Sequence, residues 1–204
     1  MNIDFTNVPK HLATRTHEAM KPVLMAPAAP GPAIHYYMIR GGTEQRNVTV
    51  WEPGTVGGEY IKTFGHYHVD ALAETYWIAS GEGFVVQQLL ERDAAGKMIA
   101  DHVAEFKVTA AGAGDSVHIP AGWGHLAVNI GQTYFVTVDD SPVNFGDADP
   151  SGHPGHADYS LVERMHGLAY YIVEHDGQPA LVRNANYQAV AKEDLAGLEV
   201  VPAG

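Results

Sequence analysis

Cysteine is absent from this chain of 204 residues. Its absence excludes disulfide bonds and metal sites built from thiolates, and it is typical of proteins that work in a reducing cytoplasm. The sequence also lacks any run of about 18 apolar residues, the length that a membrane-spanning helix needs. Its first residues do not show the basic-then-apolar pattern of a secretory signal. We therefore expect a cytoplasmic protein without a membrane partner.

Basic residues are scarce as well. The chain has 12 Lys and Arg residues against 24 Asp and Glu residues, and its formal net charge is −12. Binding to a nucleic-acid backbone depends on clustered Lys and Arg side chains, so this balance argues against a nucleic-acid partner. A small phosphate ester needs only a few local donors and remains compatible with the charge. Histidine, in contrast, is abundant, with 12 residues.

Short stretches rich in β-branched and aromatic residues recur between Gly, Pro, Asn and Asp along the chain. They predict strands at 34–40, 47–51, 59–64, 74–79, 83–90, 104–109, 115–119, 125–129, 133–138, 168–174 and 179–183. Strands this short and this regularly interrupted favour an all-β sandwich or barrel over alternating strands and helices.

The remaining segments predict few helices. Residues 14–21 and 158–166 each suit one short helix. We expect a single domain over residues 1–204, with its barrel at 34–188. Three segments accompany the barrel: an N-terminal arm at 1–33, a C-terminal tail at 189–204, and a long Pro- and Gly-rich loop at 141–157 that suits a lid.

Two histidines stand two residues apart at the end of one predicted strand. Side chains two apart on a strand face the same side, so we expect His66 and His68 to point together into the barrel. Glu74 opens the next strand pattern, and His125 comes from a distant one. Three imidazoles and one carboxylate form a ligand set that suits divalent iron, manganese, nickel or zinc.

A spaced motif surrounds the last of these ligands. It reads Gly114, five residues, Pro120, one residue, Gly122, two residues, His125, three residues and Asn129. This pattern resembles the second motif of the cupin superfamily, and the HxH pair followed by Glu74 resembles the first. The resemblance implies a cupin double-stranded β-helix, which is a jelly-roll barrel, with a few short peripheral helices.

A closer resemblance begins at Pro53. The segment PGTVGGEYIKTFGHYH at residues 53–68 is similar to the hallmark of the cupin-type glucose-6-phosphate isomerases of archaea and some bacteria. The gap between His68 and Glu74 is longer than in most cupins, and it is usual in that family. The likeness covers residues 34–188, which is most of the chain.

The resemblance implies a role for each of several residues. One divalent metal ion per chain, most often Fe²⁺ in this family and otherwise Mn²⁺, Ni²⁺ or Zn²⁺, would be bound by His66, His68, Glu74 and His125. The substrate phosphate would be held by Thr49, Thr63 and the backbone N–H of Gly65. The sugar pocket would be lined by Tyr76, His156 and Tyr159, together with Tyr36 or Tyr37.

The chain departs from the family at one position of the phosphate site. Where the family often has a Tyr-Pro pair whose Tyr contacts phosphate, this chain has Ser141-Pro142. Tyr159 or a residue of the loop that follows is a candidate replacement. The sequence leaves open which residue takes over the contact.

These residues predict an aldose–ketose isomerase that interconverts glucose 6-phosphate and fructose 6-phosphate, with a small sugar phosphate as its partner. Glu74 is the expected base of a cis-enediol route, with a metal-assisted hydride shift as the alternative. His156 or Tyr159 would open the sugar ring or move protons between oxygens. Lys62 should face away from its neighbour Thr63, so we interpret it as solvated.

Three other functions fit the same motifs. They are an isomerase of another hexose phosphate such as mannose 6-phosphate, an Fe(II) cupin dioxygenase, and a non-catalytic sugar-binding cupin. Oxygen consumption would separate the dioxygenase from the isomerases, and a substrate panel would separate the isomerases from one another. Because cupins often pair through their strands or sheets, we expect a homodimer.

Overall fold

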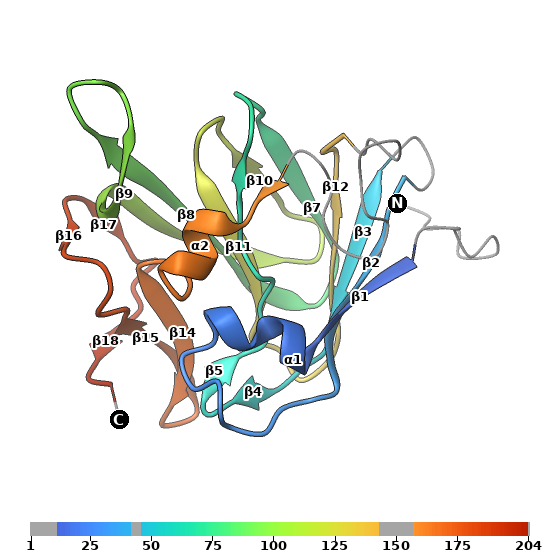
Figure 1. The fold of residues 1–204 in the computed structure, drawn as a ribbon. Coiled ribbons are helices and arrows are strands. Elements are labelled where there is room, and N and C mark those ends of the chain that lie inside the picture. The colour runs from blue at the N-terminus through green and yellow to red at the C-terminus, as the bar shows by residue number, and fades with distance from the viewer. Residues whose placement is uncertain (1–11, 42–45, 143–156, 204) are drawn as a thin grey trace.

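A computed structural model gives the structure of the chain, and it describes residues 12–41, 46–142 and 157–203. Strands dominate these residues and curve around a common interior, with short helices on the outside (Figure 1). The architecture is the predicted all-β cupin barrel, with strands distant in sequence paired side by side in each sheet.

One face of the barrel is a six-stranded sheet with the order β1-β2-β3-β12-β7-β10. Its strands are β1 (Leu12–Thr16), β2 (Ile34–Ile39), β3 (Asn47–Trp51), β12 (Phe135–Asp139), β7 (Glu74–Ser80) and β10 (Ser116–Ile119). All neighbours run antiparallel. This order brings Thr49 of β3 and Glu74 of β7 to strands that flank β12.

The second face carries the sheet β11-β8-β9-β16, in which β17 also pairs with β9. The bounds are β8 (Glu82–Arg92), β9 (Met98–Gly112), β11 (Gly124–Asn129), β16 (Ala189–Val190) and β17 (Glu193–Asp194). All six residues of β11 are buried, so this strand lies in the interior of the molecule.

Two smaller sheets complete the fold. The first has the order β18-β15-β14-β5-β4 and the second pairs β13 with β6. The bounds are β4 (Thr55–Val56), β5 (Glu59–Tyr60), β6 (Tyr67–His68), β13 (Ala157–Asp158), β14 (Tyr170–His175), β15 (Gln178–Arg183) and β18 (Val200–Val201). The predicted strand at 59–64 is therefore shorter than expected, and Lys62 contributes only an isolated bridge to Val128.

The helices are short and peripheral. They are α1 (His17–Met20), the 3-10 helix η1 (Lys21–Val23) and α2 (Ser160–Arg164). The prediction of a helix from residue 14 was wrong at its start, because residues 14–16 belong to β1 and Thr16 caps α1 by accepting from the N–H of Ala19 at 3.2 Å. Within the described residues, no helix is long and apolar enough to span a membrane.

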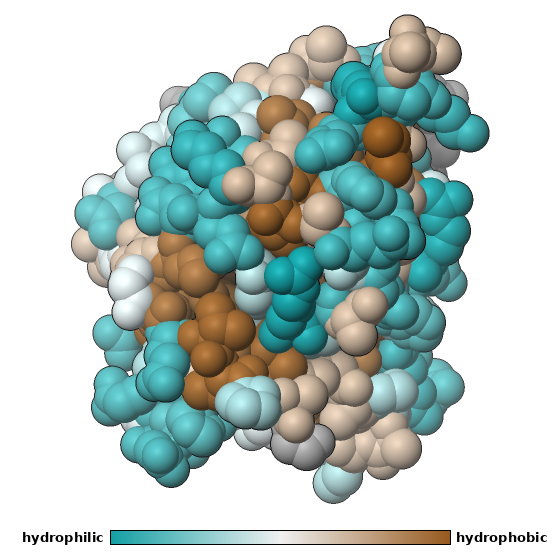
Figure 2. All heavy atoms as spheres, turned by 90° about the vertical axis from the view of Figure 1, so that its left-hand side faces the viewer, coloured by the Kyte–Doolittle hydropathy of each residue, from teal (hydrophilic) through white to brown (hydrophobic). Residues whose placement is uncertain are grey.

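Segments at both ends of the chain pack onto the barrel. Strand β1 lies within the predicted N-terminal arm and pairs with β2. Strands β16, β17 and β18 lie within the predicted tail and pair with β9 and β15. Figure 2 shows the side of the molecule that faces left in Figure 1, where apolar side chains gather in a continuous area beside polar ones.

The prediction that the Lys62 side chain is solvated was wrong. Lys62 is buried, and its Nζ lies 2.5 Å from Oε1 of the equally buried Glu59 and donates to the carbonyl oxygen of Val23 at 2.6 Å. The alternation of the strand does direct it away from Thr63, but the N-terminal segment and Tyr171 cover that side. The buried Lys62–Glu59 pair therefore connects the segment around Val23 to the segment that precedes His66 and His68.

Candidate metal centre and substrate pocket

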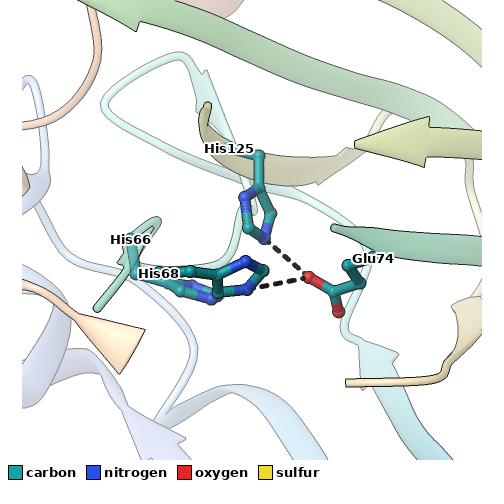
Figure 3. Close-up of side chains that lie close together, drawn as sticks. All are labelled: His66, His68, Glu74 and His125. Carbon is teal, nitrogen blue, oxygen red and sulfur yellow. Dashed lines mark ion pairs between the residues drawn. The ribbon is translucent and has the colours of Figure 1, made fainter. Parts of the chain in front are cut away.

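Three imidazoles and one carboxylate converge inside the barrel. His66 precedes β6, His68 lies in β6, Glu74 opens β7 and His125 lies in β11. One ligand atom from each lies within 4.8 Å of the others, and Figure 3 shows the four side chains directed toward one another. The two-residue spacing of the HxH pair, together with a distant strand, therefore forms the cluster that the sequence predicts.

Backbone hydrogen bonds hold two of these ligands opposite each other. The N–H of His66 donates to the carbonyl of His125 at 3.2 Å, and the N–H of His125 donates back at 3.0 Å. The next residue before His125 is Gly124, where an added Cβ would lie 2.3 Å from the ring of Tyr67. The absence of a side chain at Gly124 thus allows the histidine segment to pack directly on β11.

The ring nitrogens indicate what the cluster is suited to bind. Nδ1 of His68 lies 2.9 Å from the carbonyl of Leu72, and Nδ1 of His125 lies 3.4 Å from the carbonyl of Trp123. Protons on these nitrogens leave the Nε2 lone pairs pointing at Oε2 of Glu74, at 3.3 and 3.0 Å respectively. Lone pairs facing a carboxylate oxygen require a cation between them, either a proton or a metal ion.

Electrostatics in the cluster agree with that requirement. Burial alone would raise the pKa of Glu74, but its contacts with His125 and His68 outweigh burial and hold the pKa well below the ordinary value. For His68, burial lowers the pKa, and the hydrogen bonds to Glu74 and to the Leu72 carbonyl outweigh it and raise the pKa overall. The cluster therefore stabilises a carboxylate and positive charge at the same place, and its donor set fits a divalent metal ion.

A pocket opens beside the cluster and includes two of its residues. It is lined by Tyr36, Met38, Arg40, Thr49, Thr63, Phe64, Gly65, His66, Glu74, Tyr76, Asp139, Ser141 and Tyr159. The lining combines hydroxyl groups, one guanidinium and aromatic rings, which is a surface suited to a polar, charged small molecule.

A comparison with protein-family models identifies the family of this chain. The model of the family described as glucose-6-phosphate isomerase (GPI) matches residues 36–190. The chain belongs to this glucose-6-phosphate isomerase family. The matched residues include the four clustered side chains and all residues of the pocket lining.

Two relatives illustrate the similarity. The chain is 30% identical to the glucose-6-phosphate isomerase of Thermococcus onnurineus over 142 residues, and 29% identical to that of Pyrococcus furiosus over 141 residues. Each match covers 69% of this chain and 63% or 62% of the relative. The chain thus spans less than two thirds of the length of these relatives.

Solved cupin structures share parts of the architecture at low similarity. An oxalate oxidase has a TM-score of 0.33 at 20% identity, covering 52% of this chain and 40% of its own. The oxalate decarboxylase of Bacillus subtilis, studied for its Mn(II) centres, has a TM-score of 0.34 at 19% identity, covering 51% of this chain and 24% of its own. The capsular polysaccharide assembling protein CapF of Staphylococcus aureus has a TM-score of 0.35 at 20% identity, covering 56% of this chain and 28% of its own.

Most of the residues that the family resemblance assigned to substrate lie together. Thr49, Thr63, Gly65, Tyr36, Tyr76 and Tyr159 all line the pocket. Tyr37 does not belong to that lining, and its hydroxyl donates to Glu52 at 3.0 Å. The choice between the two neighbouring tyrosines thus falls on Tyr36. His156 lies outside the described residues.

The pocket hydroxyls differ in what they offer. Oγ1 of Thr63 accepts from the N–H of Ala127 at 3.0 Å, which leaves its proton to donate elsewhere. Burial raises the pKa of Tyr159 to about 12 and that of Tyr76 well above its ordinary value, so both phenols stay neutral at physiological pH. Tyr159 packs edge-on against Phe64 at 5.5 Å and beside the ring of His66 at 5.4 Å.

Two charged pocket residues were not identified from the sequence. Arg40 stands two and four residues after the pocket residues Met38 and Tyr36, so strand alternation continued beyond β2 was a signal that could have found it. Asp139, at the end of β12, is buried, and burial and the charge of Glu74 raise its pKa to about 7. Nothing in its local sequence distinguishes it from the neighbouring Asp140.

Proposed function

We propose that the chain interconverts glucose 6-phosphate and fructose 6-phosphate, and that it does so with one divalent metal ion bound by His66, His68, Glu74 and His125. The observation that carries the proposal is the buried convergence of these four ligands beside a polar pocket, in a chain of the glucose-6-phosphate isomerase family. A bound divalent ion would polarise the substrate carbonyl and stabilise negative charge on its oxygen.

Glu74 is the proposed base. Isomerisation moves a hydrogen between C2 and C1 of the open-chain sugar, and an enediol route requires a group that removes a proton from carbon and returns it to the neighbouring carbon. Glu74 lines the pocket and is held ionised by its histidine neighbours, so it is ready to accept that proton. Its return to the adjacent carbon completes a cis-enediol route without any net change in protons.

The tyrosine hydroxyls are proposed to orient the sugar. Tyr36, Tyr76 and Tyr159 line the pocket with neutral or hydrogen-bonding hydroxyl groups near the metal ligands. Tyr159 is further proposed, with His156, to open the ring or to move protons between the C1 and C2 oxygens. Proton movement between oxygens suits a neutral phenol, because it can donate and accept in turn.

Turnover of fructose 6-phosphate tests the proposal. The protein is stripped with chelator, reloaded with Fe²⁺, Mn²⁺, Ni²⁺ or Zn²⁺, and assayed by coupling product to glucose-6-phosphate dehydrogenase. We expect activity to vanish on stripping and to return with metal, highest with Fe²⁺. Absence of turnover with all four metals would overturn the proposed function.

The hydride-shift alternative is separable by isotope exchange. In D₂O, the enediol route places solvent deuterium on the carbon that receives the proton. We expect deuterium in the product by mass spectrometry or NMR. Complete retention of the substrate hydrogen over many turnovers would favour the hydride shift, in which Glu74 serves as a ligand alone.

An isomerase of another hexose phosphate is a second candidate, favoured by Ser141. The hydroxyl of Ser141 donates to Oδ1 of Asp139 at 2.5 Å, so the phosphate contact of the family's tyrosine is not reproduced at this position. Mannose 6-phosphate and glucose 6-phosphate, each assayed for conversion to fructose 6-phosphate at equal metal loading, separate the two candidates. A higher kcat/KM for mannose 6-phosphate would assign that substrate.

We also propose that the protein acts in the cytoplasm as a homodimer. The absence of cysteine supports a reducing compartment, and the apolar area on the face in Figure 2 is compatible with a partner. Light scattering of the full chain gives the mass in solution. A mass of one chain at micromolar concentration would contradict the dimer.

A further inference from the structure

Arg40 is the one Lys or Arg among the described residues that line the pocket. It follows the end of β2, on which Tyr36 and Met38 also face the pocket. A half-buried guanidinium at a pocket wall is costly to desolvate unless it gains an acceptor, because its five N–H groups lose water.

The partners of Arg40 in the described chain are weak. Its Nη2 donates to the thioether sulfur of Met38 at 3.1 Å, and sulfur of this kind is a poor acceptor. Within residues 12–41, 46–142 and 157–203, no carboxylate forms an ion pair with Arg40. Among the described residues, no other acceptor is hydrogen-bonded to these donors, so they can bind an anion that enters the pocket.

Arg15, a buried arginine of this region, is placed differently. Nε of Arg15 donates to the hydroxyl of Tyr36 at 3.1 Å, and its guanidinium lies 5.7 Å from the ring centre of Phe64 and 5.8 Å from that of Tyr159. Arg15 does not line the pocket and instead supports the rings that do. This leaves Arg40 as the cation that meets a ligand directly.

The neighbouring hydroxyl groups show why a cation is needed. Ser141 uses its proton on Asp139, and Asp139 also accepts from Nδ2 of Asn47 at 2.7 Å. Ser141 therefore presents no hydroxyl proton to a phosphate oxygen. Thr63 still has one and Thr49 also lines the pocket, but neutral hydroxyl donors bind a phosphate more weakly than a guanidinium fork does.

We propose that Arg40 binds the phosphate group of the sugar phosphate and sets the preference of the pocket for phosphorylated over free sugars. The inference rests on the proposed function for the identity of the sugar, and on the pocket alone for the anion. It assigns to Arg40 the contact that Ser141 does not provide.

The kinetic test compares Arg40→Gln and Arg40→Lys with the wild type, each loaded with the same metal. Loss of a charged hydrogen bond to phosphate corresponds to about a 10- to 150-fold loss of affinity. We expect Arg40→Gln to raise KM for fructose 6-phosphate by that factor while kcat changes less than about threefold. Arg40→Lys should recover part of the loss, because the charge is kept and the planar fork is lost.

Arg183→Gln is the matched control. Arg183 is exposed, lies in β15 away from the pocket lining, and donates to the Gln188 carbonyl at 3.3 Å. The Arg183→Gln variant removes the same charge at a site away from the pocket, so its KM for fructose 6-phosphate should equal that of the wild type. Melting temperatures of both Gln variants close to the wild type would show that the fold is retained.

A binding measurement separates the inference from the proposed function. Calorimetry with inorganic phosphate and with glucitol 6-phosphate needs no turnover, and Arg40→Gln should weaken both by the same factor. If the wild type fails to isomerise any hexose phosphate but loses phosphate affinity in Arg40→Gln, the proposed function is overturned and the anion site stands. If the wild type and Arg40→Gln bind both ligands equally, or neither binds, the role of Arg40 is overturned whatever the activity.

Discussion

Glu74 is the side chain that takes part in both the proposed metal site and the proposed chemistry. It touches His68 and His125 through one oxygen and also lines the pocket. A Glu74→Gln variant keeps the shape and the three imidazoles but loses the base. We expect kcat to fall by about 10²- to 10⁴-fold, the usual contribution of a positioned general base.

Metal content decides how that loss is interpreted. Elemental analysis after loading should show that Glu74→Gln still binds metal, at up to one ion per chain, since the three histidines remain. Turnover should stay low in the fully loaded fraction. Wild-type turnover per bound metal ion in this variant would contradict the role of Glu74 as base.

Local sequence patterns were sufficient to predict the clustered histidines and insufficient to predict their surroundings. His66 and His68 follow from strand alternation, and His125 follows from a spaced motif, because both signals are local. Lys62 was misinterpreted because alternation says which side a residue faces and not what covers that side. Here the covering group is the chain around Val23, which is distant in sequence.

The buried pair of Lys62 and Glu59 is the link between the N-terminal segment and the strand that leads to the histidines. Oε2 of Glu59 accepts from the N–H of Met25 at 2.8 Å, and Nζ of Lys62 donates to the carbonyl of Val23. Burial raises the pKa of Glu59. Lys62 and the N–H of Met25 oppose that rise, so these partners favour the charged carboxylate.

Replacing Lys62 by Met should destabilise the protein strongly. The change leaves Glu59 as a buried charge without its cation, which costs about 3 to 5 kcal/mol. Chemical denaturation measures the loss. In the double variant with Glu59→Gln, which keeps an acceptor for Met25, we expect a smaller loss than in Lys62→Met alone. A double variant as unstable as the sum of the two single ones would show that the pair is not coupled.

The sequence predicted most of the strands but not the start of the first helix. Nearly every expected strand exists, because each carries its own alternation and its own turn signals. The start of the predicted helix at residue 14 instead forms β1, since its pairing with β2 outweighs local helix preference. A prediction made from a window of a few residues does not include strand partners that lie far apart in the sequence.

The folded molecule contains two buried groups whose pKa values shift in opposite directions. Burial and the charge of Glu74 raise the pKa of Asp139 from 3.8 to about 7. Burial and the neighbouring His17 lower the pKa of His35 from 6.5 to about 4. Asp139 therefore favours folding below pH 4 and loses that contribution as pH rises to 7. His35 favours folding above pH 6.5 and loses its contribution as pH falls toward 4.

Between about pH 4 and 6.5 the two effects oppose each other, each with a slope of at most about 1.4 kcal/mol per pH unit. Urea denaturation in chelator at several pH values, with Asp139→Asn and His35→Gln, separates them. Relative to the wild type, the stability of Asp139→Asn should rise with pH, and that of His35→Gln should fall. Curves parallel to the wild type would show that neither group titrates with these shifts.

The pair of backbone hydrogen bonds between His66 and His125 has a further consequence. It joins two ligand segments 59 positions apart in the sequence, so the entropy of closing that loop is already lost when the apo chain folds. A metal ion entering the site meets an arrangement that is already preorganised, unlike small zinc domains that fold only around their ion. Loading should therefore leave the circular dichroism spectrum unchanged, and nearly all of the free energy gained should remain available as affinity.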